Sequence, residues 1–184
     1  MKQKIIPVII GVVCLAIGLF AGYYGKDLIN KGKFTTAQKI AIQDAIIKTQ
    51  VQQADSMLET VYEGSLDGIY PLEQAKKLGA DLLRNLRYGD DNQGYFWADT
   101  IDGTNVVLYG RKDVEGTNRL DAYVGGVYHV REIIKNGQKP GGGFTDYFYP
   151  KMDKSEPLPK RGFSLLFEPF GWVLGTGYYI EDLK

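Results

Sequence analysis

Residues 94–110 have the sequence GYFWADTIDGTNVVLYG, in which two runs rich in aromatic and β-branched residues flank Asp102-Gly103. An Asp-Gly pair between two such runs is a strong signal for a β-hairpin. Three further runs have strand character, at 141–151, 161–169 and 172–183. We therefore expect about five antiparallel strands in this half of the chain, with a solvated hairpin loop at 151–160.

The region before the hairpin has helical periodicity. Thr35 and Gln38 have the spacing of a capping box, and apolar residues then recur at helical spacing over 40–61. A second helix is expected at 71–88, and a weaker helical pattern covers 127–136. The apolar stripe of the first helix can pack on a sheet or on the same helix of a second subunit. Helices at the front and hairpin-connected strands behind them predict an α+β domain built on one antiparallel sheet.

The amino-terminal residues predict a membrane anchor. Residues 5–24, IIPVIIGVVCLAIGLFAGYY, carry no charge over about 20 positions, the length that a helix needs to cross a bilayer. Because the apolar run is longer than that of a signal peptide and the cleavage site at Ala21-Gly22 is weak, we expect a retained anchor. Residues 1–33 would then form a cytoplasmic amino terminus, a transmembrane helix and a connector, and 34–184 one extracytoplasmic domain. Lysines on both sides of the span leave its orientation undecided by charge.

The composition narrows the range of possible functions. Lys plus Arg and Asp plus Glu balance at 22 each, so no basic field is present to hold a nucleic acid. The single cysteine, Cys14, lies in the apolar run, and His129 is the single histidine. A zinc site, a histidine-dependent triad or a thiol redox pair would need more of these residues. Gly175-Thr176-Gly177 has no helix behind it to receive a pyrophosphate. We therefore expect no enzyme activity and no cofactor.

The chain is rich in tyrosine and tryptophan, aromatic residues whose rings carry a hydroxyl or an N–H group. Strand alternation places Tyr95 and Trp97 on one sheet face, opposite to Phe96, and it likewise groups Tyr147 with Tyr149. Such a face suits a small ligand with an anionic head and a short carbon tail. The alternative is that these rings are core, with each polar tip bonded to a backbone carbonyl. The full set is Tyr88, Tyr95, Trp97, Tyr109, Tyr147, Tyr149, Trp172, Tyr178 and Tyr179.

Several short blocks occur in a recognisable order. They are LRYG at 86–89, GYFW at 94–97, EGTN at 115–118, GFTDY at 143–147, PK at 150–151 and FGWVLGTG at 170–177. This series, from about Thr35 to Leu183, resembles the single Cache domain, type 2, of bacterial chemoreceptors (methyl-accepting chemotaxis proteins) and sensor kinases.

The resemblance implies a long amino-terminal helix packed on a PAS-like antiparallel sheet, after one transmembrane helix in the inner membrane. It also implies an extracytoplasmic sensor, periplasmic or extracellular and homodimeric, that serves chemotaxis or transmembrane signal transduction. Its ligand would be a short carboxylate such as acetate, propionate, pyruvate or lactate. Arg87 or Lys151 would neutralise the carboxylate, and Tyr95 and Tyr147 would donate hydrogen bonds. The implied ligand-binding residues are Arg87, Tyr95, Trp97, Tyr109, Tyr147 and Lys151.

Two departures from the family pattern leave alternatives open. Tyr109-Gly110 stands where the family commonly has a His-Pro pair, so the ligand can be larger, differently charged or absent. Family receptors normally continue into a second membrane helix and a cytoplasmic signalling module, whereas this sequence stops at Lys184. It is then either part of a receptor or an anchored Cache protein that signals through a partner. The alternative function is a membrane-anchored interaction or dimerisation module without a small-molecule ligand.

Overall fold

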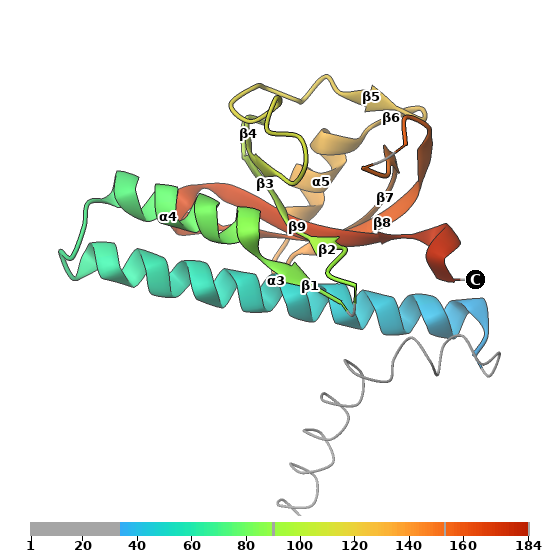
Figure 1. Cartoon of the computed structure of the whole chain (residues 1–184), viewed down its shortest axis with the longest axis horizontal. Helices are drawn as coiled ribbons and strands as arrows, with labels where there is room; N and C mark the ends of the chain where they lie inside the picture. Colours follow the sequence, from blue (N-terminus) through green and yellow to red (C-terminus); the bar gives the residue numbers. More distant parts are fainter. Residues whose placement is uncertain (1–33, 90, 153, 184) are drawn as a thin grey trace, which may run out of the picture.

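The structure, a computed structural model, describes residues 34–89, 91–152 and 154–183 (Figure 1). The anchor expected at 5–24, with the rest of 1–33, lies outside these residues. Within the described ranges, no helix is both long enough and apolar enough to cross a membrane.

Helix α3 (Thr36–Leu66) begins at the expected capping box. The Thr35 Oγ1 atom accepts a hydrogen bond from the Gln38 N–H at 3.3 Å, and the Gln38 Oε1 atom accepts one from the Thr35 N–H at 2.9 Å. Both bonds satisfy backbone donors that the first helical turn leaves unpaired. The apolar stripe of α3 is buried on the sheet and on helix α4, as Val51 and Leu58 illustrate. Of the two partners considered for the stripe, the structure shows the sheet.

Helix α4 (Leu72–Asn85) is three residues shorter than expected at its carboxyl end. Leu86 is extended, and Arg87–Tyr88 form strand β1, which pairs with β2 (Gly94–Tyr95). The pairing places the ring of Tyr88 where a side chain at Gly94 would stand, because a Cβ there would lie 2.6 Å from ring atoms of Tyr88. The helix therefore ends before the residues that pair as β1, a pairing that helical periodicity cannot show.

The five-stranded sheet is antiparallel, in the order β4-β3-β9-β8-β7, as expected. The hairpin at Asp102-Gly103 joins β3 to β4, and Gly103 supplies the positive φ of 86° that its turn requires. The strands are β3 (Trp97–Thr100), β4 (Asn105–Leu108), β7 (Gly143–Pro150), β8 (Pro157–Phe167) and β9 (Trp172–Tyr179). The remaining elements are β5 (Tyr123–Val124), β6 (Val127–Tyr128), α5 (His129–Gly137) and the 3-10 helices η1 (Glu168–Phe170) and η2 (Ile180–Leu183).

The loop expected at 151–160 is too long, because β8 already begins at Pro157. Residues 157–160 pair with β7, but the pairing of β8 with β9 starts only at Lys160 and Tyr179. The two prolines, Pro157 and Pro159, therefore have a neighbouring strand on one side only, where a missing N–H is tolerated. The weak helix expected at 127–136 likewise begins later, because Val127–Tyr128 form β6.

The sheet separates two hydrophobic clusters. Figure 1 shows α3 and α4 on one side of the sheet and α5 on the other. Phe96 is fully buried against α3 and α4, whereas the neighbouring Trp97 packs with residues of α5. Strand alternation is thus confirmed at this position, and it directs two consecutive aromatic residues into different layers.

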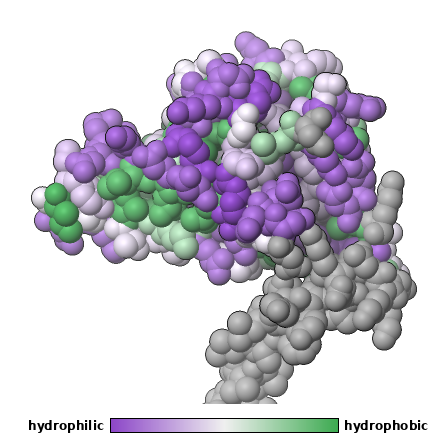
Figure 2. Space-filling model, in the orientation of Figure 1, coloured by the Kyte–Doolittle hydropathy of each residue, from purple (hydrophilic) through white to green (hydrophobic). Residues whose placement is uncertain are grey.

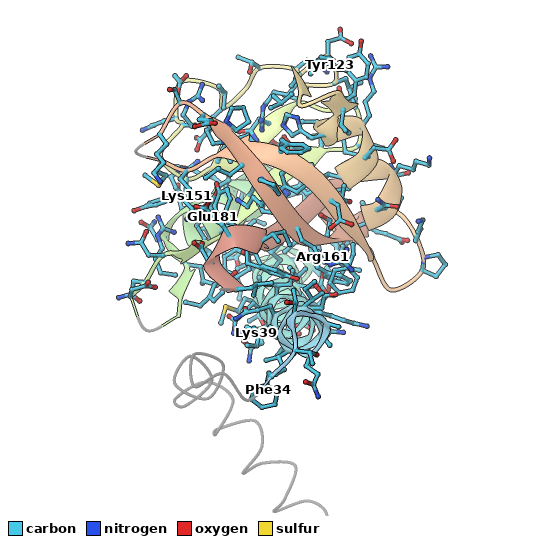
Figure 3. All side chains as sticks on the ribbon, turned by 90° about the vertical axis from the view of Figure 1, so that its right-hand side faces the viewer. Phe34, Lys39, Tyr123, Lys151, Arg161 and Glu181 are labelled. Carbon is cyan, nitrogen blue, oxygen red and sulfur yellow. The ribbon has the colours of Figure 1, made fainter. Side chains whose placement is uncertain are left out.

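An ion-pair cluster ties α3 to the sheet. The Arg161 guanidinium donates to the carboxylate of Asp44 on α3 at 2.9 Å and to that of Asp146 on β7 at 2.9 Å. The Tyr178 hydroxyl donates to the same Asp44 carboxylate at 3.0 Å. Figure 3 shows Arg161 directed toward the α3 side of the sheet. Asp44, which interrupts the apolar stripe of α3, therefore has a structural use.

Replacing Arg161 by alanine is expected to lower the free energy of unfolding by about 2 kcal/mol, because the Asp44 carboxylate loses its charged partner in a partly buried site. Chemical denaturation of the purified chain measures this change. Arg111→Ala is the matched control: its pair with Asp113 is exposed, with side chains 48% and 65% accessible. The control should change stability by less than about 0.5 kcal/mol. Equal effects of the two substitutions would contradict the structural role of the cluster.

Candidate functional site

A small cavity lies on the α5 side of the sheet, closed by residues between β4 and α5. Its empty volume is about 280 Å³, including the part that opens to solvent. Because part of this volume is open solvent, the enclosed space is smaller still, and a ligand that enters it can have only a few heavy atoms. Its lining consists of Tyr95, Trp97, Asp99, Leu108, Arg119, His129, Val130, Ile133, Tyr147, Tyr149 and Lys160.

Lys160 is the most unusual member of the lining. Its side chain is 2% exposed in a cage of aromatic rings, and its Nζ atom donates a hydrogen bond to the Tyr95 hydroxyl at 2.6 Å. Nζ lies 4.5 Å from the ring centroid of Tyr95, 4.8 Å from that of Tyr179 and 5.4 Å from that of Trp97. Among the residues described, no carboxylate lies within ion-pair distance of it. A buried ammonium group without a carboxylate favours the entry of an anion.

A second charged group of the lining, Arg119, is already engaged. Its Nη1 atom lies 3.8 Å from the Asp99 Oδ1 atom, and its Nη2 atom lies 3.5 Å from the His129 Nε2 atom. A guanidinium can only donate, so the His129 Nε2 atom accepts and the ring proton resides on Nδ1. The Asn105 Nδ2 atom also donates to the Asp99 Oδ1 atom, at 2.8 Å. Arg119, Asp99 and His129 thus form a buried polar group in the wall of the cavity.

Burial shifts the pKa values of Asp99 and His129 in opposite directions. It raises the pKa of the Asp99 carboxyl to about 6, although Arg119 and Asn105 favour the charged form. Burial, together with the positive charges of Arg119 and Lys160, lowers the pKa of His129 to about 4. At neutral pH, Asp99 is therefore an anion and His129 is neutral.

The Asp99 carboxyl is expected to make folding less favourable as pH rises through about 6. Between its unfolded pKa near 4 and its folded value, only the folded chain holds the proton, which stabilises the folded state at the acidic end. His129 has the opposite effect. Asp99→Asn removes the first contribution, so the stability difference between variant and parent should move by about 2 kcal/mol in favour of the variant between pH 4 and pH 7.5.

Urea denaturation at the two pH values checks this prediction. The control variant is Asp146→Asn, which removes an exposed carboxylate from β7 and should show a much smaller change between the two pH values. If the difference in the free energy of unfolding between Asp99→Asn and the parent is the same at both pH values, burial does not raise the pKa of Asp99.

The aromatic walls depend on two glycines that lie beneath Trp97. A Cβ atom on Gly175 would lie 2.7 Å from the Trp97 Cζ2 atom, and one on Gly162 would lie 2.9 Å from the Cη2 atom. The indole therefore lies flat against the sheet, while its buried Nε1 atom has no hydrogen-bond partner in the described part of the chain. The ring of Tyr147 meets Trp97 edge-on at 6.3 Å and is stacked with His129 at 5.8 Å. Gly175, set aside as a nucleotide motif, thus has a packing role.

The structure brings three of the six expected ligand-binding residues together in the lining, namely Tyr95, Trp97 and Tyr147. Arg87 and Tyr109 lie one layer behind: the Arg87 guanidinium lies 3.4 Å from the ring centroid of Tyr109, whose ring is 5.7 Å from that of Tyr95. Lys151 lies outside the lining. It pairs with Glu181 at 2.8 Å and Asp182 at 2.6 Å, and Figure 3 shows Lys151 and Glu181 close together.

The sequence patterns did not point to the polar members Lys160, Arg119 and Asp99. Asp99 could have been found, because alternation from Tyr95 and Trp97 places it on the same sheet face. Lys160 fell within the expected loop, and Arg119 lies in an irregular segment without periodicity. Elsewhere, no group of three His, Cys, Asp or Glu side chains in the described residues is placed to hold a metal ion.

Comparisons with known proteins agree on one family. The sensor histidine kinase MctS of Rhizobium johnstonii is 31% identical over 183 residues, which cover 97% of this chain and 38% of the kinase. The methyl-accepting chemotaxis protein McpP of Pseudomonas putida is 28% identical over 137 residues, 73% of this chain and 24% of that receptor. The chain thus spans well under half the length of either relative.

A solved structure described as the periplasmic sensor domain of a chemotaxis protein superimposes with a TM-score of 0.72. It is 27% identical, and the match covers 76% of this chain and 96% of that one. The family model described as single Cache domain 2 matches residues 40–184. The chain therefore belongs to the single Cache domain 2 family of sensor domains.

Proposed function

We propose that residues 34–184 are an extracytoplasmic sensor domain that binds a short carboxylate of the acetate, propionate, pyruvate or lactate class. The observation that carries this proposal is Lys160, a cation that is 2% exposed, faces the cavity and lacks a carboxylate partner among the described residues. A ligand carboxylate would supply the missing negative charge. Because the aromatic cage excludes water, the pair would be stronger there than at the surface.

The other lining groups support a ligand with a charged head and a short apolar tail. The Tyr95 hydroxyl, which accepts a hydrogen bond from Lys160 Nζ at 2.6 Å, keeps its own proton to donate to the carboxylate. The Trp97 Nε1–H, which has no partner among the described residues, is a second donor for it. The apolar side chains of Val130 and Ile133 on α5 would contact the tail. The Trp97 Nε1 atom is buried, so binding would also remove the cost of leaving it unpaired.

We propose that three expected ligand-binding residues support the site from outside the cavity lining, namely Arg87, Tyr109 and Lys151. Arg87 packs on Tyr109 and Tyr109 packs on Tyr95, so this stack fixes the phenol that meets Lys160. Lys151, which follows β7, pairs with the carboxylates of Glu181 and Asp182 on η2. The ring of Tyr179, close to Lys151, is one of the rings around Lys160. In this proposal Lys160 takes the charge-neutralising role that the family resemblance gave to Arg87 or Lys151.

Residues 5–24 are proposed to anchor the domain in the inner membrane, and the domain to signal to a cytoplasmic module or a partner protein. The two relatives are a sensor kinase and a chemotaxis receptor, and the similar solved domain is periplasmic. We further propose a homodimer. Exposed apolar side chains occur where α3 meets α4, with Leu66 and Ile69 66% and 73% exposed, and Figure 2 shows hydrophobic surface on this side.

A thermal-shift screen of the purified chain against short organic acids, amino acids and amines tests the proposal. A ligand at about 100 times its dissociation constant should add about 2.7 kcal/mol of stability, which raises Tm by several degrees. A selective rise with short carboxylates supports the sensor. A folded sample that responds to none of the compounds would favour the interaction module instead.

A further inference from the structure

We propose that Asp99 is a specificity-determining residue, which neutralises Arg119 and so limits the cavity to ligands that carry one negative charge. This inference rests on the proposed carboxylate site and adds a rule for choosing among anions. Asp99 need not contact the ligand for this role, because it acts by pairing with Arg119 and neutralising its charge.

The charges of the lining carry the inference. Lys160 and Arg119 are its two cations, Asp99 is its one carboxylate, and His129 is held neutral beside Arg119. Two positive charges and one negative charge leave the lining with a single net positive charge. One ligand carboxylate balances that charge, whereas a second one would be a buried anion without a counter-charge.

The position of Asp99 is fixed, so it cannot withdraw to make room for another anion. Its side chain is 2% exposed and lies 3.8 Å from the Arg119 Nη1 atom. The Asn105 Nδ2 atom holds its Oδ1 atom at 2.8 Å. Arg119 is itself held, because its backbone N–H donates to the Gly103 carbonyl at 2.8 Å. A second ligand carboxylate that approached Arg119 would therefore meet a neighbouring anion, a repulsion that discriminates against dicarboxylates.

Calorimetric titration of the purified full chain with propionate and malonate at neutral pH tests this rule. In malonate a second carboxylate replaces the methyl group of propionate, so the pair differs mainly in charge. The parent should prefer propionate, and Asp99→Asn should raise the affinity for malonate relative to propionate by at least tenfold. Adding Arg119→Met to Asp99→Asn should cancel that gain, because the freed guanidinium is gone.

Asp146→Asn is the matched control, since it removes the same charge from an exposed position on β7 and should leave the ratio unchanged. Asp99→Ser, whose hydroxyl can also accept from Asn105, replaces Asp99→Asn if that variant does not fold. A malonate-to-propionate ratio that stays at the parent value in the folded variant would overturn the role of Asp99 while leaving the carboxylate site intact. A parent that binds neither acid nor any other short carboxylate would overturn the site as well.

Discussion

Replacement of Lys160 by methionine is expected to weaken carboxylate binding by about 3 kcal/mol, roughly a hundredfold. Methionine keeps the unbranched apolar stem among the aromatic rings but removes the charge that faces the cavity. The folded state without ligand should be as stable as the parent, or more stable, because a buried cation without a carboxylate partner is lost. Calorimetry measures the affinity, and a thermal melt without ligand measures the stability.

Lys151→Met is the matched control, because Lys151 is the lysine that the family resemblance singled out. Its Nζ atom pairs with Glu181 and Asp182 and lies outside the cavity lining. Its replacement should leave carboxylate affinity within about twofold of the parent, a difference of about 0.4 kcal/mol. The reverse result, with binding lost in Lys151→Met and kept in Lys160→Met, would return the charge-neutralising role to Lys151.

Replacement of Phe96 by alanine is expected to lower the free energy of unfolding by about 3 to 5 kcal/mol. Phe96 is fully buried between the sheet and the helices α3 and α4, with the ring of Tyr88 at 5.7 Å. Its loss leaves a cavity in the layer that holds the long helix on the sheet. Chemical denaturation of the variant and the parent gives the difference.

Phe148→Ala is the control for this substitution. Each phenylalanine stands between two aromatic residues of the cavity lining, Phe96 between Tyr95 and Trp97 and Phe148 between Tyr147 and Tyr149. Phe148 is 37% exposed, however, so its replacement should cost less than about 1.5 kcal/mol. Comparable losses for both variants would show that Phe96 contributes no more to stability than the half-exposed Phe148.

The elements with a strong local signal were predicted correctly from the sequence. The capping box at Thr35, the turn at Asp102-Gly103 and the alternation around Trp97 each depend on residues close together in the chain. The ends of α4 and β8 were placed wrongly, because each is set by pairing with an adjacent strand: Arg87–Tyr88 pair with Gly94–Tyr95, and Pro157 pairs with Pro150. Periodicity carries no information on such pairing.

The candidate site was predictable only for its aromatic walls. Tyr95, Trp97 and Tyr147 lie on strands whose alternation is clear, and they line the cavity. Lys160 and Arg119 were hidden for different reasons. Lys160 lay in residues assigned to a loop, so strand alternation could not be used to predict which side of the sheet it faces. Arg119 is brought to the cavity by an irregular segment after β4, whose backbone is fixed by long-range hydrogen bonds.

The most direct measurement is a crystal structure of the protein grown with the carboxylate that raises its Tm most. The proposed role of Lys160 predicts a carboxylate oxygen within about 3 Å of its Nζ atom, with the ligand tail against Val130 and Ile133. A ligand bound at Arg87 or Lys151, with the cavity around Lys160 empty, would contradict it.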